Sequence, residues 1–187
     1  VTGLVSSATL KNPEQPNEPP SASHLGSGLA RAQQGTNAHR LFEALKYSSP
    51  ENLLTFADDD LKEPLRFLAT TQEIPMMDII NRGHVEWGFA LLYEKSLMQG
   101  QIDLWGILDQ TLWIVDYKTG SQKYSETAFK QLEVYTWALY RMKYLTQVYE
   151  VKLAVVYPMD KAVKVRTLES LEELDARMVA VVREDAI

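Results

Sequence analysis

The order of apolar and polar residues predicts helices in the first part of the chain. Over residues 36–45, four apolar side chains recur at the i, i+3, i+4 and i+7 spacing of an amphipathic helix: Ala38, Leu41, Phe42 and Leu45. Thr36 precedes them as a plausible cap. Residues 51–71 show further helical patterning around leucines 53, 54, 65 and 68.

From residue 84 the pattern changes to that of strands. Three short segments rich in β-branched and aromatic residues predict strands over 84–93, 98–106 and 111–118. A helix is predicted over 125–145, followed by a nearly all-apolar strand over 151–158, which we expect inside the sheet. A strand near 163–168 and a helix near 169–183 complete the pattern. This order favours an α/β sandwich with a central mixed β-sheet flanked by helices.

Composition separates a tail from a folded domain. Residues 1–28 are rich in Pro, Ser, Asn and Gly, which is typical of a disordered linker or tail. We expect one domain over residues 29–187, since 187 residues with 45% hydrophobic content suffice for a core. The chain has no cysteine and no apolar run approaching about 18 residues, so we expect a cytoplasmic protein without disulfides or membrane spans.

Acidic residues gather at two places where they could bind a cation. The first is the run Asp58, Asp59 and Asp60, for which a solvated loop and helix cap is the simpler interpretation. The second is the end of the strand 111–118, where an apolar segment finishes with Asp116 and Lys118. Because side chains alternate along a strand, these two residues point the same way. A half-buried ion pair that closes the strand would also explain them.

The preceding strand adds a second carboxylate to this strand end. Alternation places Gln101, Asp103 and Trp105 on one face, opposite Ile102 and Leu104. If the two strands pair as a hairpin, Asp103 approaches Asp116, and the two carboxylates repel unless a cation neutralises them. Carboxylates and water select Mg²⁺ or Mn²⁺. An ammonium group beside such an ion can orient a water and stabilise charge on a phosphate.

Four segments together resemble the RecB-type nuclease domain of the PD-(D/E)xK superfamily. They are G-T-N-A-H (35–39), G-Q-I-D-L-W (100–105), I-V-D-Y-K-T-G (114–120) and Q-L-E-V-Y (131–135). The resemblance covers roughly residues 30–145, and it is specific because four elements occur in the right order. It implies a restriction-endonuclease-like sandwich and a metal-dependent deoxyribonuclease of the exonuclease type.

The resemblance also assigns roles to individual residues. It implies that the metal is bound by the side chains of His39, Asp103 and Asp116 and by the backbone carbonyl of Tyr117. Lys118 would be the catalytic lysine. Gln131 and Tyr135, four apart on one helix face, would shape the site and position the DNA strand.

Several of these residues also have ordinary structural explanations. His39 lies at the edge of an apolar helix face, where a histidine is often a core or surface residue. Tyr135 has core-like neighbours. Glu86 could support the metal site, since family members often carry an acid on that strand. Lys123 and Lys130 belong to a basic segment between residues 118 and 143 that could contact DNA or could be a solvated helix face.

The wider context follows from what the sequence lacks. Without cysteine it cannot hold the iron–sulfur cluster of some related branches, so it looks closer to the C-terminal nuclease domains of RecB- and AddA-like helicase–nucleases. It has no phosphate-loop motif of a motor, and its net charge of −6 argues against strong DNA binding by itself. The resemblance implies as partners DNA, as single-stranded strand ends, and a helicase or ATPase domain in the same polypeptide or complex.

Two other functions remain open at this stage. The first is a catalytically silent DNA-binding or docking module with the same fold. The second is a hydrolase that uses Asp103 and Asp116 as an acid/base pair, as glycosidases do. The second leaves Lys118 and the Gln131/Tyr135 pair without a role.

Overall fold

The computed structural model describes residues 37–184, with side chains described through residue 182. The expected linker over residues 1–28, the start of the domain at residue 29 and the helix cap at Thr36 all lie outside the described residues. Within them, the first helix covers residues 37–44, as the spacing of Ala38, Leu41 and Phe42 predicts.

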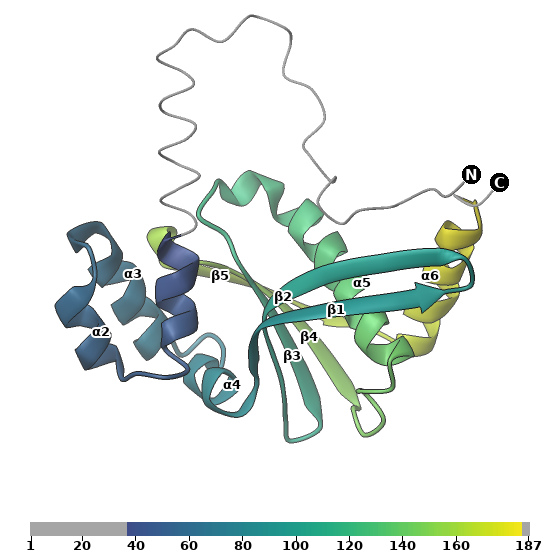
Figure 1. Cartoon of the computed structure of the whole chain (residues 1–187), viewed down its shortest axis with the longest axis horizontal. Coiled ribbons are helices and arrows are strands. Elements are labelled where there is room, and N and C mark those ends of the chain that lie inside the picture. Colours follow the sequence, from purple (N-terminus) through teal and green to yellow (C-terminus); the bar gives the residue numbers. More distant parts are fainter. Residues whose placement is uncertain (1–36, 185–187) are drawn as a thin grey trace, which may run out of the picture.

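The described residues form a five-stranded sheet with the strands in chain order, β1-β2-β3-β4-β5 (Figure 1). Their bounds are His84–Tyr93, Ser96–Leu108, Thr111–Tyr117, Glu150–Tyr157 and Ala162–Leu168. β3 and β4 are parallel and the other neighbours are antiparallel, so the sheet is mixed. As expected from its apolar sequence, β4 lies between two other strands and is almost entirely buried.

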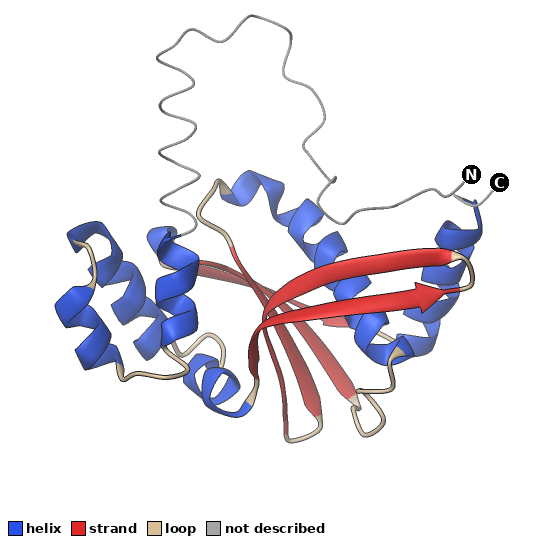
Figure 2. Cartoon of the chain, viewed as in Figure 1, coloured by secondary structure: helices blue, strands red, loops and turns tan. Residues whose placement is uncertain are grey.

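Helices cover both faces of the sheet (Figure 2). The helix over residues 37–44 packs with α3 (Asp59–Thr70) and α4 (Met76–Arg82) in one apolar cluster. On the other face α5 (Ser125–Arg141) packs in a second cluster, with α6 (Leu171–Glu184) beside it. The short helices α2 (Pro50–Phe56), η2 (Gln122–Tyr124) and η3 (Pro158–Asp160) complete the described elements. The predicted α/β sandwich with a central mixed sheet is therefore confirmed.

Three helix predictions need comment. The sequence pattern did not predict α4, because its seven residues are too few to show a helical period. The predicted end of the long helix at residue 145 is wrong, since α5 ends at Arg141. The aspartate run lies at the start of α3: Asp58 is at the N-cap position without a side-chain cap bond, and Asp59 pairs with Lys62 at 2.6 Å.

A close contact between two glycines brings α4 against the β1–β2 hairpin. A Cβ atom at Gly83, the residue that ends α4, would lie 2.3 Å from the carbonyl oxygen of Trp105. A Cβ atom at Gly106 would lie 3.0 Å from the Cα atom of Gly83. Because neither position has room for a side chain, the start of β1 is held directly on the backbone of β2.

Candidate functional site

Three acidic residues form a row across β1, β2 and β3. Leu104 pairs with Val115 at the end of the β2–β3 ladder, so the same register places Asp103 opposite Asp116. On the other side, the β1–β2 register places Glu86 opposite Asp103, but this pair is absent from the ladder, and Glu86 has a φ of 47°. We call Glu86, Asp103 and Asp116 the acidic row.

The break in pairing at Glu86 corrects two expectations about strand faces. Ile102 was expected on the other face of β2 from Trp105, yet both side chains belong to the apolar cluster on the α5 face. Leu104 belongs to the cluster on the other face of the sheet. His84, which strict alternation along β1 would place on the same face as Glu86, stacks on Trp105. A residue with a left-handed backbone interrupts the alternation of side chains between the two faces. The face of a residue in β1 or β2 therefore cannot be found by counting past this point.

Asp103 is the centre of the row. Its Oδ2 atom accepts a hydrogen bond from the backbone N–H of Tyr117 at 2.8 Å and lies 3.8 Å from Nδ1 of His39. One ligand atom each from His39, Glu86 and Asp103 lies within 4.8 Å of the others. Among the expected metal ligands, the structure thus brings His39 and Asp103 together, and it adds Glu86, which was expected only in support.

Asp116 lies beside this group and not within it. Lys118 donates a hydrogen bond to Oδ1 of Asp116 at 3.0 Å, and its Nζ lies 2.8 Å from Oδ2. Oδ2 is nevertheless buried without a hydrogen-bond partner among the described residues. The Asp116–Lys118 ion pair that was the structural alternative is therefore present, at the edge of the acidic row.

Burial makes the row costly to ionise. Burial and the neighbouring Asp116 raise the pKa of Asp103 to about 7. Burial also raises the pKa of Asp116, against the opposing effect of Lys118, and burial and then Glu43 raise the pKa of Glu86. The pKa of His39 is lowered, mainly by burial, which favours the neutral imidazole that metals bind.

These observations fit a hard divalent cation. Two carboxylates and a neutral imidazole provide converging ligand atoms, and Asp116 adds a buried carboxylate beside them that is ion-paired with Lys118. A cation would neutralise carboxylates that otherwise repel. His39, Glu86, Asp103 and Asp116 are the side chains that could hold it. The backbone of Tyr117 also lies near the group, since its N–H bonds Asp103 and it opposes the lowering of the His39 pKa.

Gln131 and Tyr135 reach the acidic row from α5. The side-chain amide of Gln131 donates a hydrogen bond to the hydroxyl of Tyr135 at 2.6 Å. Burial raises the pKa of Tyr135, and the charges of Asp116 and Asp103 raise it further. The ring of Tyr135 also packs on Phe89, with centroids 5.6 Å apart. Tyr135 therefore belongs to the core through its ring and faces the row through its hydroxyl.

The sequence interpretation missed Glu43, which lies near the row, and Lys164, which is in register with Asp116 two strands away and whose ammonium bonds Gln122 and Ser125. Glu43 lies on the first helix, four residues after His39, and its charge contributes to the raised pKa of Glu86. The i, i+4 spacing from His39 was the signal that could have identified it. Lys164 follows from the sheet register, since Asp116 pairs with Val155 and Val155 with Lys164. Nothing in its local sequence marks it.

Two lysines expected to contact DNA lie on the surface near the start of α5. Lys123 is in η2 and Lys130 is in the second turn of α5, and both are exposed. Lys123 lies over the ring of Tyr124, with its Nζ 5.9 Å from the centroid. Their exposure leaves them accessible to a phosphate and does not by itself assign them a role.

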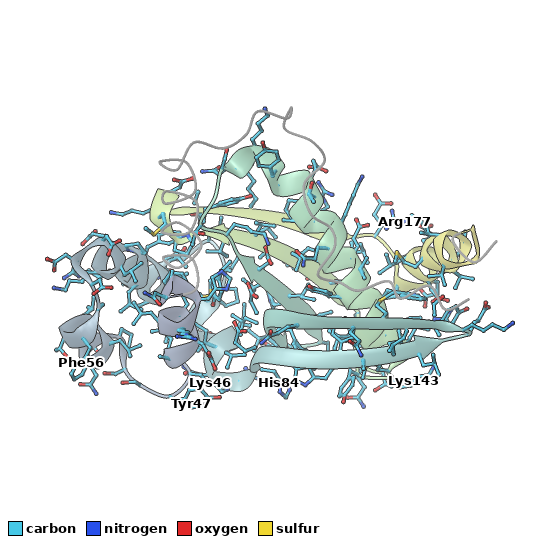
Figure 3. The ribbon with its side chains drawn as sticks, turned by 45° about the horizontal axis from the view of Figure 1, so that its top comes forward. Lys46, Tyr47, Phe56, His84, Lys143 and Arg177 are labelled. Carbon is cyan, nitrogen blue, oxygen red and sulfur yellow. The ribbon has the colours of Figure 1, made fainter. Side chains whose placement is uncertain are left out.

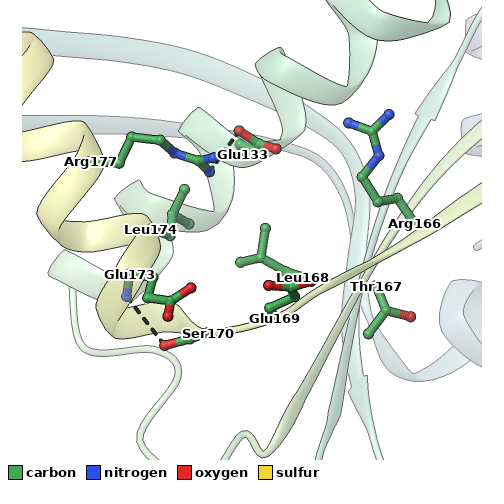
Figure 4. Close-up of a pocket in the computed structure, with 9 residues that line it drawn as sticks. All are labelled: Glu133, Arg166, Thr167, Leu168, Glu169, Ser170, Glu173, Leu174 and Arg177. Atoms are coloured by element: carbon green, nitrogen blue, oxygen red, sulfur yellow. Dashed lines mark hydrogen bonds and ion pairs between the residues drawn. The ribbon is translucent and has the colours of Figure 1, made fainter.

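A separate cavity of about 370 Å³ lies between β5, α5 and α6 (Figure 4). It contains Arg166 and Arg177, which could attract a phosphate. Arg177 is paired with Glu133 at 3.0 Å, however, and Arg166 with Glu126 at 2.7 Å. None of the acidic row lines the cavity, so it is not the site that the motifs predict.

Comparison with known proteins places the chain in a family. No described helix combines the length and the apolar character that crossing a membrane requires. Comparison with curated proteins gives no significant match. The sequence profile of the PD-(D/E)XK nuclease superfamily matches residues 14–186, which include every residue of the acidic row as well as His39, Lys118, Gln131 and Tyr135. The chain therefore belongs to the PD-(D/E)XK nuclease superfamily.

Proposed function

We propose that this chain is a divalent-metal-dependent deoxyribonuclease that hydrolyses phosphodiester bonds at the acidic row. The observation that carries the proposal is the row itself, with Lys118 beside Asp116 and His39 beside Asp103. A buried cluster of carboxylates with one ammonium group matches the needs of metal-assisted phosphoryl transfer. It has no comparable value in stabilising a fold, because burial opposes its ionisation.

Each residue has a role in this proposal. His39, Glu86, Asp103 and Asp116 would hold Mg²⁺ or Mn²⁺, and such an ion would supply Lewis-acid activation of water and of the phosphate. Lys118 orients the attacking water and stabilises negative charge on the phosphate. Water attacks phosphorus, one P–O ester bond breaks, and the leaving sugar oxygen takes up a proton. Gln131 and Tyr135 position the strand, and Lys123 and Lys130 contact its backbone.

The finer assignment is a RecB-type exonuclease domain that processes DNA ends beside a helicase or ATPase domain. It is supported by the four motif segments and by the absence of a phosphate-loop motif from the chain. The net charge of −6 also favours a nuclease that receives its strand from a partner. A role in recombinational repair and a cytoplasmic location are part of the same proposal, as is a linker function for residues 1–28.

A cleavage assay tests the proposal. End-labelled linear single-stranded and duplex DNA and circular single-stranded DNA are incubated with Mg²⁺, Mn²⁺ or EDTA. We expect degradation of linear DNA that stops in EDTA and in Asp103→Asn. Asp109→Asn, in the exposed β2–β3 turn, is the matched control and should remain active. DNA binding without cleavage under any metal condition would instead support the silent module, and cleavage of circles would exclude strict exonuclease action.

A further inference from the structure

A cluster of four aromatic side chains lies next to the acidic row without belonging to it. His84 stacks on Trp105, with centroids 4.5 Å apart and planes at 26°. Trp87 and Tyr144 make edge contacts with Trp105 at 5.5 and 5.8 Å, and with each other at 5.3 Å. We call these four residues the aromatic platform.

The platform exposes ring surface to solvent. Trp105 is buried, with 3% of its surface accessible, and forms the floor. Tyr144 is 46% exposed, His84 is exposed and Trp87 is partly exposed. The indole N–H of Trp105 has no hydrogen-bond partner among the described residues, which is unusual for a buried donor. The cluster is thus not an ordinary, fully satisfied piece of core.

The backbone fixes Tyr144 and its neighbour Lys143 at the end of α5. The N–H of Tyr144 bonds the carbonyl of Leu139, and the N–H of Lys143 bonds that of Tyr140, both at 3.0 Å. These bonds form a Schellman motif, in which the residue at the position of Lys143 is usually glycine. Lys143 adopts a φ of 67° there, so a positively charged side chain occupies a position that disfavours it sterically.

Positive charge lies at both ends of the platform. Figure 3 shows His84 and Lys143 along the same margin of the molecule, with Lys46 near His84. The ammonium of Lys46 donates to the carbonyls of Ile80, Asn81 and Gly83 at 2.8–2.9 Å. Burial and this ammonium lower the pKa of His84, so its ring is neutral near pH 7 and Lys46 provides the charge.

The platform adjoins the acidic row along β1 and β2, and Trp87 and Trp105 lie on the face that α5 covers. His84 and Trp105 are paired, and they lie two residues along β1 and β2 from Glu86 and Asp103, a separation of about 6.6 Å at the strand rise. A continuous series of ring contacts also runs from Trp87 through Phe89 to Tyr135, whose hydroxyl lies near the row.

We propose that the aromatic platform stacks the bases of single-stranded DNA next to the bond that the acidic row cleaves. The inference rests on the proposed function and names its substrate as a single strand, because only unpaired bases can stack on side chains. Exposed aromatic rings flanked by lysines are the features with which proteins hold single strands without sequence preference. A duplex keeps its bases stacked on each other and gains nothing from the platform.

The test compares the affinity for DNA that carries bases with the affinity for a sugar–phosphate backbone without bases. Fluorescence anisotropy in EDTA, where no cleavage is expected, measures Kd for an oligothymidine, an abasic oligomer of the same length and a duplex. We expect the oligothymidine to bind at least about fivefold more tightly than the abasic strand, the effect of one stacked base. Tyr144→Leu should remove this difference, whereas Tyr144→Phe, which keeps the aromatic face, should retain it.

Two further variants separate stacking from charge and from surface hydrophobicity. Lys143→Gly suits the left-handed backbone, so the domain should fold, and we expect weaker binding of both oligothymidine and abasic strand with a smaller salt dependence. Phe56→Ala removes an 86% exposed aromatic at the left margin of Figure 3, away from His84 and Lys143, and should leave Kd unchanged.

Three results would overturn the inference: equal Kd for oligothymidine and abasic strand, no loss in Tyr144→Leu, or an equal loss in Phe56→Ala. The cleavage assay of the wild-type chain is read separately. Metal-dependent cleavage with base-independent binding would refute the platform and leave the proposed function standing. Base-dependent binding without any cleavage would refute the nuclease assignment and identify a single-strand binding module.

Discussion

At the scale of the residue, ionisation of the acidic row destabilises the fold but provides the charged carboxylates that the proposed function requires. Asp103 is held by a backbone N–H and faces Asp116, yet burial keeps its pKa near 7. A carboxyl whose pKa is raised in the folded state binds more protons there than in the unfolded chain. Stability without metal therefore falls as pH rises from about 4 to about 7, and a bound cation reverses the effect.

The first prediction concerns Asp103→Asn in EDTA. Asn keeps an acceptor for the Tyr117 N–H and removes the charge, so the variant should unfold at higher urea than wild type at pH 8. The expected gain in the free energy of unfolding is about 2–4 kcal/mol, and it should vanish near pH 4. Urea titrations across this range measure it. If the free energy of unfolding depended on pH in the same way in both proteins, the pKa of Asp103 would not be raised in the folded state.

The second prediction concerns metal binding to the same proteins. Mn²⁺ at pH 8 should raise the thermal midpoint of wild type and of Asp109→Asn, because the ion binds only the folded state. It should have little effect on Asp103→Asn, which has lost a central ligand. An equal shift in all three proteins would place the ion elsewhere.

The third prediction separates Lys118 from Asp116. Lys118→Ala should abolish cleavage, because no ammonium remains beside the phosphate, while Mn²⁺ still binds. Removing Lys118 takes away a group that lowers the pKa of Asp116, so the Mn²⁺ affinity of this variant should be weaker at pH 7 than at pH 8.5. Asp116→Asn should weaken Mn²⁺ binding at both values. Calorimetric titration distinguishes the two, and a loss in Lys118→Ala that persists at pH 8.5 would make Lys118 structural.

At the scale of the element, the β1–β2 hairpin and α5 meet at Gly100. A Cβ atom at this position would lie 2.7 Å from the ring of Phe89 and 2.9 Å from that of Tyr135. Both rings are buried and packed against each other, so neither can move freely. Gly100 therefore determines how closely the hydroxyl of Tyr135 approaches the acidic row.

The fourth prediction compares Gly100 with Gly88, another glycine of this hairpin. Gly100→Ala should destabilise the domain by about 1–3 kcal/mol through overpacking and should lower cleavage by displacing Tyr135. Gly88→Ala is the matched control, because a Cβ atom there meets nothing within 4 Å. Urea unfolding and turnover measured on both variants check this. Equal behaviour of the two would show that the ring contact does not position Tyr135.

At the scale of the whole molecule, charge opposes the proposed substrate. The net charge is −6, although the segment from Lys118 to Lys143 carries five basic residues against two acidic ones. Affinity for DNA scales with the number of phosphates neutralised, so few contacts mean weak, salt-sensitive binding. A partner that delivers the strand would compensate by raising its effective concentration at the site.

The fifth prediction follows from this balance. The isolated 187-residue chain should cleave DNA slowly and with low affinity, losing activity as salt rises, and Mn²⁺ should support it better than Mg²⁺. Fusion to an unrelated DNA-binding module through residues 1–28 should accelerate cleavage without changing the metal requirement. Binding at nanomolar concentrations in physiological salt would contradict the need for a partner and favour an independent nuclease.

The sequence alone determined the elements and the chemistry that lies on neighbouring strands. The helical period around Phe42 and the apolar run of β4 reflect which surfaces of each element are buried, and such patterns are local. Asp103 and Asp116 could be paired in advance because a short connection joins β2 and β3 as a hairpin. Lys118 and Asp116 could be paired because they are two residues apart on one strand.

Only the tertiary structure decided how these parts converge. The left-handed backbone at Glu86 breaks the alternation of β1, so strand parity could not show that its carboxyl joins His39 and Asp103. Lys164 shares the sheet register of Asp116 only because β4 lies between β3 and β5 and pairs with both. The aromatic platform combines β1, β2 and the end of α5, elements that are distant in sequence. Contacts of this kind depend on how elements pack in space, and no local period records that packing.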